Sequence, residues 1–236
     1  MVREGGSRAA YSKGPPGDYV TEVDLAAERE IVALLSVETP GVPVVGEEAG
    51  GDAGEVHWAV DPLDGTTNFV HGFPIVGVSV ALVETGRPVA GCVHAPLLGR
   101  TWSASAGGGA WLDGRTQPLR VADRPVDEAI VATGFPFRRK ELLPRYIRVL
   151  TAALERFEDL RRPGAASLDL AWVADGTFDG FFELGLAAWD VAAGGLLIRE
   201  AGGVVSDWTG GEGWLSGDII AGSPSVQRAL VGLARG

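Results

Sequence analysis

A short apolar stretch that runs into an acidic bend constrains this chain more than any other feature of its sequence. Residues 57–60 have the apolar character of a buried strand, which ends at Asp61. Pro62 then bends the chain, Asp64 follows, and Gly65 permits a close approach of the backbone. Two carboxylates and a carbonyl on one tight bend suit a hard cation with oxygen ligands, such as Mg²⁺. The alternative is a solvated turn, because Asp, Pro and Gly are common turn residues.

Two further acidic segments favour the metal interpretation. Glu47 follows an apolar strand predicted at residues 42–45, just before the acidic bend. Asp190 begins an otherwise apolar helix, where a carboxylate needs a partner. A helix cap is the alternative for Asp190. After the bend, residues 66–68 can open a helix whose first N–H groups would face an anion, so a phosphate beside the cation is expected.

The first half of the chain predicts a helix followed by an antiparallel sheet. A helix is expected over residues 22–37, where apolar residues recur at helical spacing, with Thr21 as its cap and Pro40-Gly41 as its end. Short strands separated by tight turns then favour an antiparallel sheet. These strands are expected at residues 76–83, 89–94, 101–105, 110–112 and 119–121.

The second half alternates helices with strands, which is typical of an α/β arrangement. Strands are expected at residues 129–133, 177–182 and 204–205, and helices at 141–157, 168–174 and 189–200. The change of pattern after Arg124-Pro125 predicts two subdomains. Residues 1–125 would form an N-terminal α+β subdomain with the metal-binding loop, and residues 126–236 a C-terminal α/β subdomain that completes the active site.

Charge and cysteine content limit the partners and the compartment. The formal net charge of −11 argues against a nucleic acid or an anionic membrane as the main partner. The sequence shows neither a signal peptide nor an apolar run that could span a bilayer. The single cysteine, Cys92, excludes an internal disulfide and fits a reducing cytoplasm.

Four motifs in a fixed order resemble those of the inositol monophosphatase family. Residues 58–74 resemble its first signature, and residues 189–203 resemble its second. Residues 46–48 match a third block, and Lys13, Asp18, Val20-Thr21 and Asp24 match a fourth. The resemblance implies the layered α/β/α/β/α sandwich of the inositol monophosphatase and fructose-bisphosphatase type, a mixed α/β (α+β) fold. It also implies a homodimer and sensitivity to lithium.

The same resemblance implies a site with two or three Mg²⁺ ions. Glu47 and Asp61, with the Leu63 carbonyl, would hold the activating ion. Asp61 would bridge to a second ion, which Asp64 and Asp190 also bind, and Glu47 would reach a third through water. Four converging carboxylates repel one another and are tolerable only when cations neutralise them.

The resemblance also assigns the residues around the substrate. Thr66 would lie near the attacking water and bond to Asp24, so that Thr66, Asp24 and Glu47 form the catalytic group. Gly65 and Thr66 would offer N–H groups to the phosphate, and Lys13 matches a basic residue near the metals. The expected substrate-binding residues are Asp64, Gly65, Thr66, Gly164, Ala165, Ala166, Glu183 and Asp190. Ala165 departs from the family, because Ser or Thr is common there. Ser167 either replaces the lost hydroxyl or simply starts a helix.

The sequence therefore predicts Mg²⁺-dependent hydrolysis of a small phosphate monoester by metal-activated water. A phosphorylated polyol, inositol monophosphate first of all, is the expected substrate. Histidinol phosphate and fructose 1,6-bisphosphate are alternatives on the same fold. An alternative of another class is a regulatory protein that binds a partner and keeps the phosphatase fold without depending on turnover.

Overall fold

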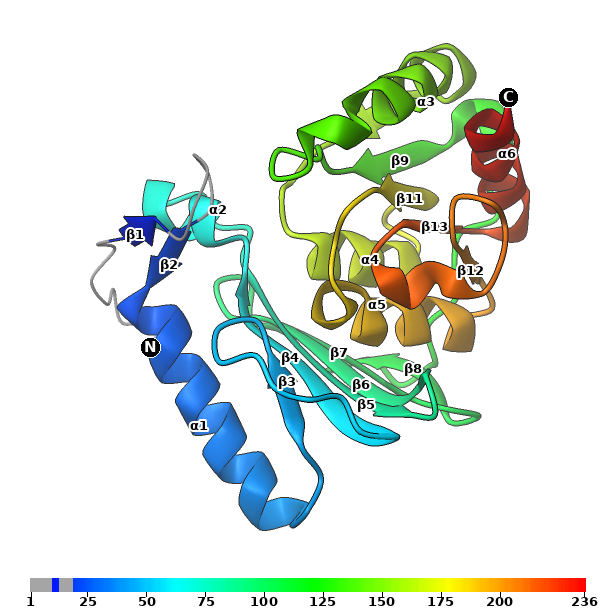
Figure 1. Cartoon of the computed structure of the whole chain (residues 1–236). Coiled ribbons are helices and arrows are strands. Elements are labelled where there is room, and N and C mark those ends of the chain that lie inside the picture. The colour runs from blue at the N-terminus through cyan, green and yellow to red at the C-terminus, as the bar shows by residue number, and fades with distance from the viewer. Residues whose placement is uncertain (1–9, 13–18) are drawn as a thin grey trace.

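Helices and sheets alternate in five layers (Figure 1). The computed structural model describes residues 10–12 and 19–236. The layers are helix α1 (Glu22–Glu38), a six-stranded sheet, helices α4 (Ala166–Ala174) and α5 (Ala188–Glu200), a five-stranded sheet, and helices α3 (Leu143–Arg156) and α6 (Pro224–Arg235). The predicted α/β/α/β/α sandwich is thus confirmed. No helix of this part of the chain is long and apolar enough to cross a membrane.

The six-stranded sheet carries the acidic bend. Its order is β3 (Val44–Gly46), β4 (Val56–Asp64), β5 (Gly77–Glu84), β6 (Arg87–Ala95), β7 (Arg100–Ser105) and β8 (Gly109–Leu112). Only the pair β3–β4 is parallel. The register of β4 against β5 shifts between Asp61 and Asp64, so the bend is a bulge at the end of a strand. Helix α2 (Thr66–His71) follows it, and a two-stranded ribbon, β1 (Ala10–Ser12) with β2 (Tyr19–Thr21), precedes α1.

The five-stranded sheet brings three strand ends to one edge. Its order is β10 (Asp159–Arg161), β9 (Ile130–Thr133), β11 (Gly180–Glu183), β13 (Ile219–Gly222) and β12 (Val204–Ser206). Strands β10, β9 and β11 run parallel, whereas β13 runs antiparallel to both of its neighbours. The segments that follow β10, β9 and β11 therefore leave the sheet at the same edge.

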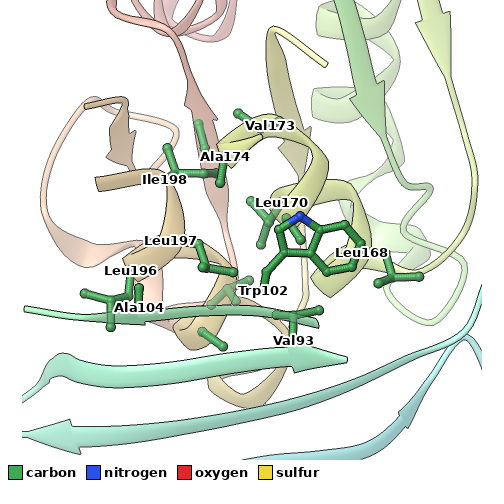
Figure 2. Packing of buried hydrophobic residues seen from close by; sticks show 14 of the residues in the cluster. Val93, Trp102, Ala104, Leu168, Leu170, Val173, Ala174, Leu196, Leu197 and Ile198 are labelled. Atoms are coloured by element: carbon green, nitrogen blue, oxygen red, sulfur yellow. The ribbon is translucent and has the colours of Figure 1, made fainter. Parts of the chain in front are cut away.

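Small residues let α4 and α5 pack tightly between the sheets. A Cβ atom at Gly194 of α5 would lie 2.4 Å from the Leu170 Cβ of α4. Trp102 of β7 projects toward these helices (Figure 2) and donates a 3.0 Å hydrogen bond to Asp175. One buried cluster thus joins both halves of the chain. The predicted boundary at residue 125 lies between the two sheets, but the division into subdomains stays a prediction.

Local signals located most elements, and one predicted strand is wrong. Thr21 caps α1 with a reciprocal capping box, as expected. The segment 119–121 is not a strand. Its amides bond to two different elements, Leu119 N to the Ala110 carbonyl and Val121 N to the Ala201 carbonyl, so it crosses from the sheet edge to the end of α5. Strands β1, β2, β10 and β13 and helix α6 were not predicted.

Candidate active site

A cavity of about 570 Å³ opens where the two sheets approach each other. It is lined by the segments after β3, β9 and β10, the end of β4, the start of α2, the segment before α4, the end of β11 and the start of α5. Most of the predicted site residues border this cavity: Glu47, Asp61, Leu63, Asp64, Gly65, Thr66, Gly164, Ala165, Ala166, Glu183 and Asp190. Asp24 lies behind Thr66, and Lys13 and Asp18 fall outside the described residues.

The bulge of β4 fixes the acidic bend. The Leu63 amide donates a 2.9 Å hydrogen bond to Asp61 Oδ1, which holds the Asp61 carboxylate against its own backbone. Asp61 is only 1% exposed. Gly65 has a φ of +90°, and a Cβ there would lie 2.9 Å from the Ile75 carbonyl oxygen, so the turn requires glycine.

Ser167 orients Asp64 rather than facing a substrate. Its amide and its hydroxyl donate hydrogen bonds of 2.7 and 2.6 Å to Asp64 Oδ2. Ser167 is fully buried and does not line the cavity. The hydroxyl therefore does not compensate for Ala165, but ties the start of α4 to the acidic bend.

Thr66 and Asp24 form a buried pair beneath the cavity. Thr66 Oγ1 lies 3.0 Å from Asp24 Oδ1 and 3.1 Å from the Leu63 carbonyl oxygen. The amide and the hydroxyl of Thr21 bond to the other Asp24 oxygen. Because carboxylate oxygens only accept, Asp24 draws the Thr66 proton toward itself and leaves the lone pairs of Thr66 Oγ1 free to accept from a third group.

Glu28, which the sequence analysis missed, supports the Glu47 loop. Its carboxylate accepts hydrogen bonds of 2.9 Å from the Glu48 amide and 2.7 Å from the Ala49 amide. Glu28 is 3% exposed. Its position four residues after Asp24, on the same face of α1, is the signal that could have revealed it.

Asn68 connects α2 to the predicted substrate loop. Its side-chain amide lies within hydrogen-bonding distance of three carbonyl oxygens, at 2.8 Å from Ile75, 3.0 Å from Pro163 and 3.3 Å from Gly164. Gly164 has a φ of +90°. The contact fixes residues 163–164 beside the acidic bend, although they lie almost a hundred positions away in the sequence.

Crowding and burial raise the pKa values of the acidic residues. Burial, followed by the charges of Glu47, Asp64 and Asp190, raises the pKa of Asp61 well above its ordinary value. Burial likewise raises the pKa of Asp64 to about 6, against the hydrogen bonds from Ser167. Burial and then the Asp64 charge raise the pKa of Asp190 to about 7. The cluster therefore destabilises its own ionised form, as expected of a site built for cations.

The donor set suits a hard cation, but the ligands are not preassembled. Four carboxylates and the Leu63 carbonyl supply only oxygen, which Mg²⁺ prefers. In the described part of the chain, no three acidic, histidine or cysteine side chains are gathered closely enough to hold an ion. One oxygen of Asp64 is turned to Ser167, and one of Asp190 to the Ala187 amide at 2.7 Å. The chemistry fits Mg²⁺, and side-chain rotation would complete the coordination.

One part of the lining is basic and aromatic. Phe135, Phe137, Arg138, Arg139 and Arg162 border the cavity beside Glu183. The sequence analysis assigned no role to these five side chains. The clustering could not be read from the sequence, because it depends on β9 and β10 being neighbours in the sheet.

The comparison with known families assigns the chain to one of them. Residues 2–235 match the model of the inositol monophosphatase family. The chain belongs to the inositol monophosphatase family. Nus factor SuhB of Escherichia coli (strain K12) is 44% identical over 226 residues, which are 94% of this chain and 84% of that relative. Inositol-1-monophosphatase of Mesorhizobium japonicum is 44% identical over 221 residues, 92% of this chain and 82% of that relative.

Solved structures show the same family fold. The native crystal structure of extragenic suppressor protein suhB from Bartonella henselae matches with a TM-score of 0.92 at 38% identity. The match covers 99% of this chain and 92% of that structure. This inositol monophosphatase family member therefore keeps nearly the whole fold of its relatives.

Proposed function

We propose that this chain is a metal-dependent phosphatase that hydrolyses a small phosphate monoester, inositol monophosphate being the first substrate to test. The observation that carries the proposal is the meeting of Glu47, Asp61, Asp64 and Asp190 at one cavity, with the Leu63 carbonyl among them. These five groups come from three separate segments of the chain. A solvated turn or an isolated helix cap would not bring them together.

The acidic groups are the proposed ligands of two or three Mg²⁺ ions. Glu47, Asp61 and the Leu63 carbonyl would hold one ion, and Asp61, Asp64 and Asp190 a second. When bound, Mg²⁺ supplies an acidified water and electrostatic stabilisation of the phosphoryl and leaving oxygens. The support from this chain is the raised pKa of Asp61, Asp64 and Asp190, caused by burial and mutual repulsion that cations relieve.

Thr66 and Asp24 are proposed to orient the attacking water. The Thr66 hydroxyl donates a hydrogen bond to Asp24 Oδ1 over 3.0 Å, so Thr66 Oγ1 can in turn accept a hydrogen bond from a water in the cavity. This arrangement points the water oxygen lone pair toward the phosphorus. Glu47, which borders the same cavity, completes the proposed catalytic group.

Different groups are proposed to bind the two parts of the substrate. The N–H groups of Gly65 and Thr66 at the start of α2 are proposed to bind the phosphate. Glu183 and the loop of Gly164, Ala165 and Ala166 are proposed to contact the alcohol part. Gly134 leaves room for Glu183, since a Cβ there would lie 2.1 Å from the Glu183 carboxylate.

A phosphate-release assay tests the proposal. Inositol 1-phosphate is offered with 5–10 mM Mg²⁺ or with EDTA, on the order of what a weakly held Mg²⁺ requires. Histidinol phosphate and fructose 1,6-bisphosphate complete the substrate panel. Release that requires Mg²⁺ supports the proposal, and no release from any ester with Mg²⁺ present contradicts it. Lithium inhibition, a homodimer and a cytoplasmic location complete the proposal and can be checked with the same protein.

A second candidate is a regulatory protein that keeps the phosphatase fold. It is favoured by the name of the E. coli relative, Nus factor SuhB. The two candidates differ in their dependence on Asp64. Asp64→Asn should remove phosphate release if turnover is the function, whereas a regulatory protein would lack phosphate release already in the wild type.

A further inference from the structure

Three parallel strands bring arginine and phenylalanine side chains to the cavity, in addition to the carboxylates. Strands β10, β9 and β11 are hydrogen-bonded neighbours and run in the same direction. Arg162 follows β10, Phe135 to Arg139 follow β9, and Glu183 ends β11. Their ends share one edge of the sheet, which is where open α/β sheets bind ligands. This edge faces the cavity that the acidic bend borders from the other sheet.

Two aromatic rings hold Arg162 in place. Its guanidinium lies over Phe135 at 5.3 Å and over Phe137 at 5.4 Å from the ring centroids. The two rings meet edge to face at 5.6 Å. Gly164 closes the other side, since a Cβ there would lie 2.8 Å from Arg162 Nη1. The long side chain is therefore oriented before any ligand arrives, which reduces the entropy lost on binding.

The Arg162 guanidinium has no acceptor within the described residues. The two aromatic rings and Gly164 pack against it, and its charge opposes the burial that raises the pKa of the nearby Glu183 and Asp169, but no hydrogen bond or ion pair reaches it from residues 10–12 and 19–236. Arg161 next to it pairs with Asp159 instead and does not line the cavity. Arg162 is exposed and presents planar N–H donors that match a phosphate or a carboxylate.

Two more arginines add positive charge beside it. Arg138 and Arg139 line the same cavity. Arg138 Nη1 lies 3.8 Å from Glu47 Oε1, and Arg139 pairs with Glu141. A protein with a formal charge of −11 repels anions at long range, so this local cluster is where an anion would be favoured.

We propose that Arg162, with Arg138 and Arg139 beside it, binds a second anionic group carried on the alcohol part of the substrate. This inference rests on the proposed function and specifies its substrate class. The preferred esters would carry a phosphate or a carboxylate at a distance from the phosphate that is removed. Glu183, which lines the same cavity, would meet the hydroxyl groups that join the two anionic ends.

Paired substrates test the proposal. Fructose 1-phosphate and fructose 1,6-bisphosphate share one ester and differ in the second phosphate. Glycerol 3-phosphate and 3-phosphoglycerate form a second pair, which tests a carboxylate as the second anion. The measured quantity is the ratio of kcat/KM within each pair, with Mg²⁺ present. For the wild type we expect the doubly anionic ester to be preferred in at least one pair.

Variants at neighbouring arginines give the control. Arg162→Met should lower the ratio of the preferred pair by about 10- to 100-fold, the range expected for a lost hydrogen bond between charged groups. Arg162→Lys should give an intermediate ratio, because it keeps the charge and loses the planar fork. Arg161→Met removes a charge one residue away and should leave the ratio at the wild-type value.

The outcomes separate this inference from the proposed function. A wild-type ratio of one or less in both pairs, or equal ratios in Arg162→Met and the wild type, overturns the second anion site. An equal fall in Arg161→Met overturns it too, since it would reflect net charge alone. If the wild type hydrolyses neither these four esters nor inositol 1-phosphate, the proposed function has failed. Calorimetric binding of the same pairs to the wild type and Arg162→Met then decides the inference separately.

Discussion

At the scale of single residues, the cavity depends on side chains that hold other side chains. Thr21 and Thr66 both donate hydrogen bonds to Asp24, and Ser167 donates hydrogen bonds to Asp64. Each supporting residue is fully buried. Buried polar groups that are fully paired keep a fixed geometry, because an unpaired state in the interior costs free energy. Thr66 is therefore oriented before a substrate is bound, whereas the carboxylate ligands are not yet assembled around an ion.

Thr66 gives the first prediction. Thr66→Val keeps the shape of the side chain and removes the hydroxyl, so the attacking water loses its acceptor. We expect kcat in a phosphate-release assay to fall about 100-fold, the lower range for a lost proton-handling group. Thr66→Ser keeps the hydroxyl and should retain most of the activity. Activity of Thr66→Val within threefold of the wild type would show that the hydroxyl does not orient the water.

Asp64 gives the second prediction. Asp64→Asn keeps an oxygen that can accept from Ser167 but removes the charge needed for a metal. Phosphate release should fall more than about 100-fold while the circular dichroism spectrum stays unchanged. The raised pKa of about 6 shows that the ionised form of Asp64 is unfavourable in the folded state. Without metal at pH 8.5, the free energy of unfolding of the variant should therefore exceed that of the wild type by roughly 1–3 kcal/mol. Unchanged turnover would refute the assignment of Asp64 as a ligand.

At the scale of elements, the sequence predicts the helices and strands that local signals determine, but not those that depend on long-range contacts. Helix α1, its Thr21 cap and the β5–β6 hairpin carry their own periodicity and turn residues, and they were predicted within a few positions. The segment 119–121 has the composition of a strand, but its amides find partners on two separate elements. Composition cannot show which partner a segment meets, so this strand was predicted wrongly.

The residues of the site likewise fall into those that the sequence revealed and those that depend on long-range contacts. The acidic bend is contiguous in sequence, and resemblance to a family placed Glu47, Glu183 and Asp190 beside it. The supporting residues Glu28 and Ser167 and the arginine cluster depend on contacts across 20 to 103 positions. These contacts follow from the packing of α1 and α4 on the first sheet and from the order of strands in the second.

Helix α1 gives the third prediction, through Glu28. Glu28→Ala removes the carboxylate that accepts hydrogen bonds from the Glu48 and Ala49 amides beside α1. We expect a loss of roughly 1–3 kcal/mol in the free energy of unfolding. The Mg²⁺ concentration for half-maximal activity should rise about tenfold, because the Glu47 loop is no longer held in place. Glu30→Ala, on the exposed face of the same helix, is the control.

Two measurements separate the roles of Glu28. Urea unfolding reports its contribution to stability, and Mg²⁺ titration of the initial rate reports its effect on the site. If Glu28→Ala lowers stability without changing the Mg²⁺ dependence, then Glu28 supports the fold alone. An unchanged free energy of unfolding would contradict the buried hydrogen bonds themselves.

At the scale of the whole molecule, the acidic cavity couples stability to pH and to metal. Burial is the first cause of the raised pKa of each acid, which reaches about 6 for Asp64, about 7 for Asp190 and about 8 for Glu183. A carboxyl whose pKa is higher in the folded than in the unfolded state stabilises the fold below its unfolded value, near pH 4. That stability is lost as pH rises through the folded values, from about 6 to about 8.

The fourth prediction follows from this loss of stability with rising pH. The metal-free protein should have a lower Tm at pH 8.5 than at pH 5.5, and Mg²⁺ should raise the Tm more at pH 8.5, where the ligands are ionised. At a concentration 100-fold above Kd, one bound ion adds ~2.7 kcal/mol. For a chain of this size, that corresponds to a Tm increase of roughly 5–10 °C. Scanning calorimetry with Mg²⁺ or with NaCl at equal ionic strength measures the difference. Equal Tm shifts for the two salts at pH 8.5 would mean that dissolved salt only screens the repulsion among the four carboxylates and that no ion is bound. Only a specific site would distinguish Mg²⁺ from the general effect of ionic strength.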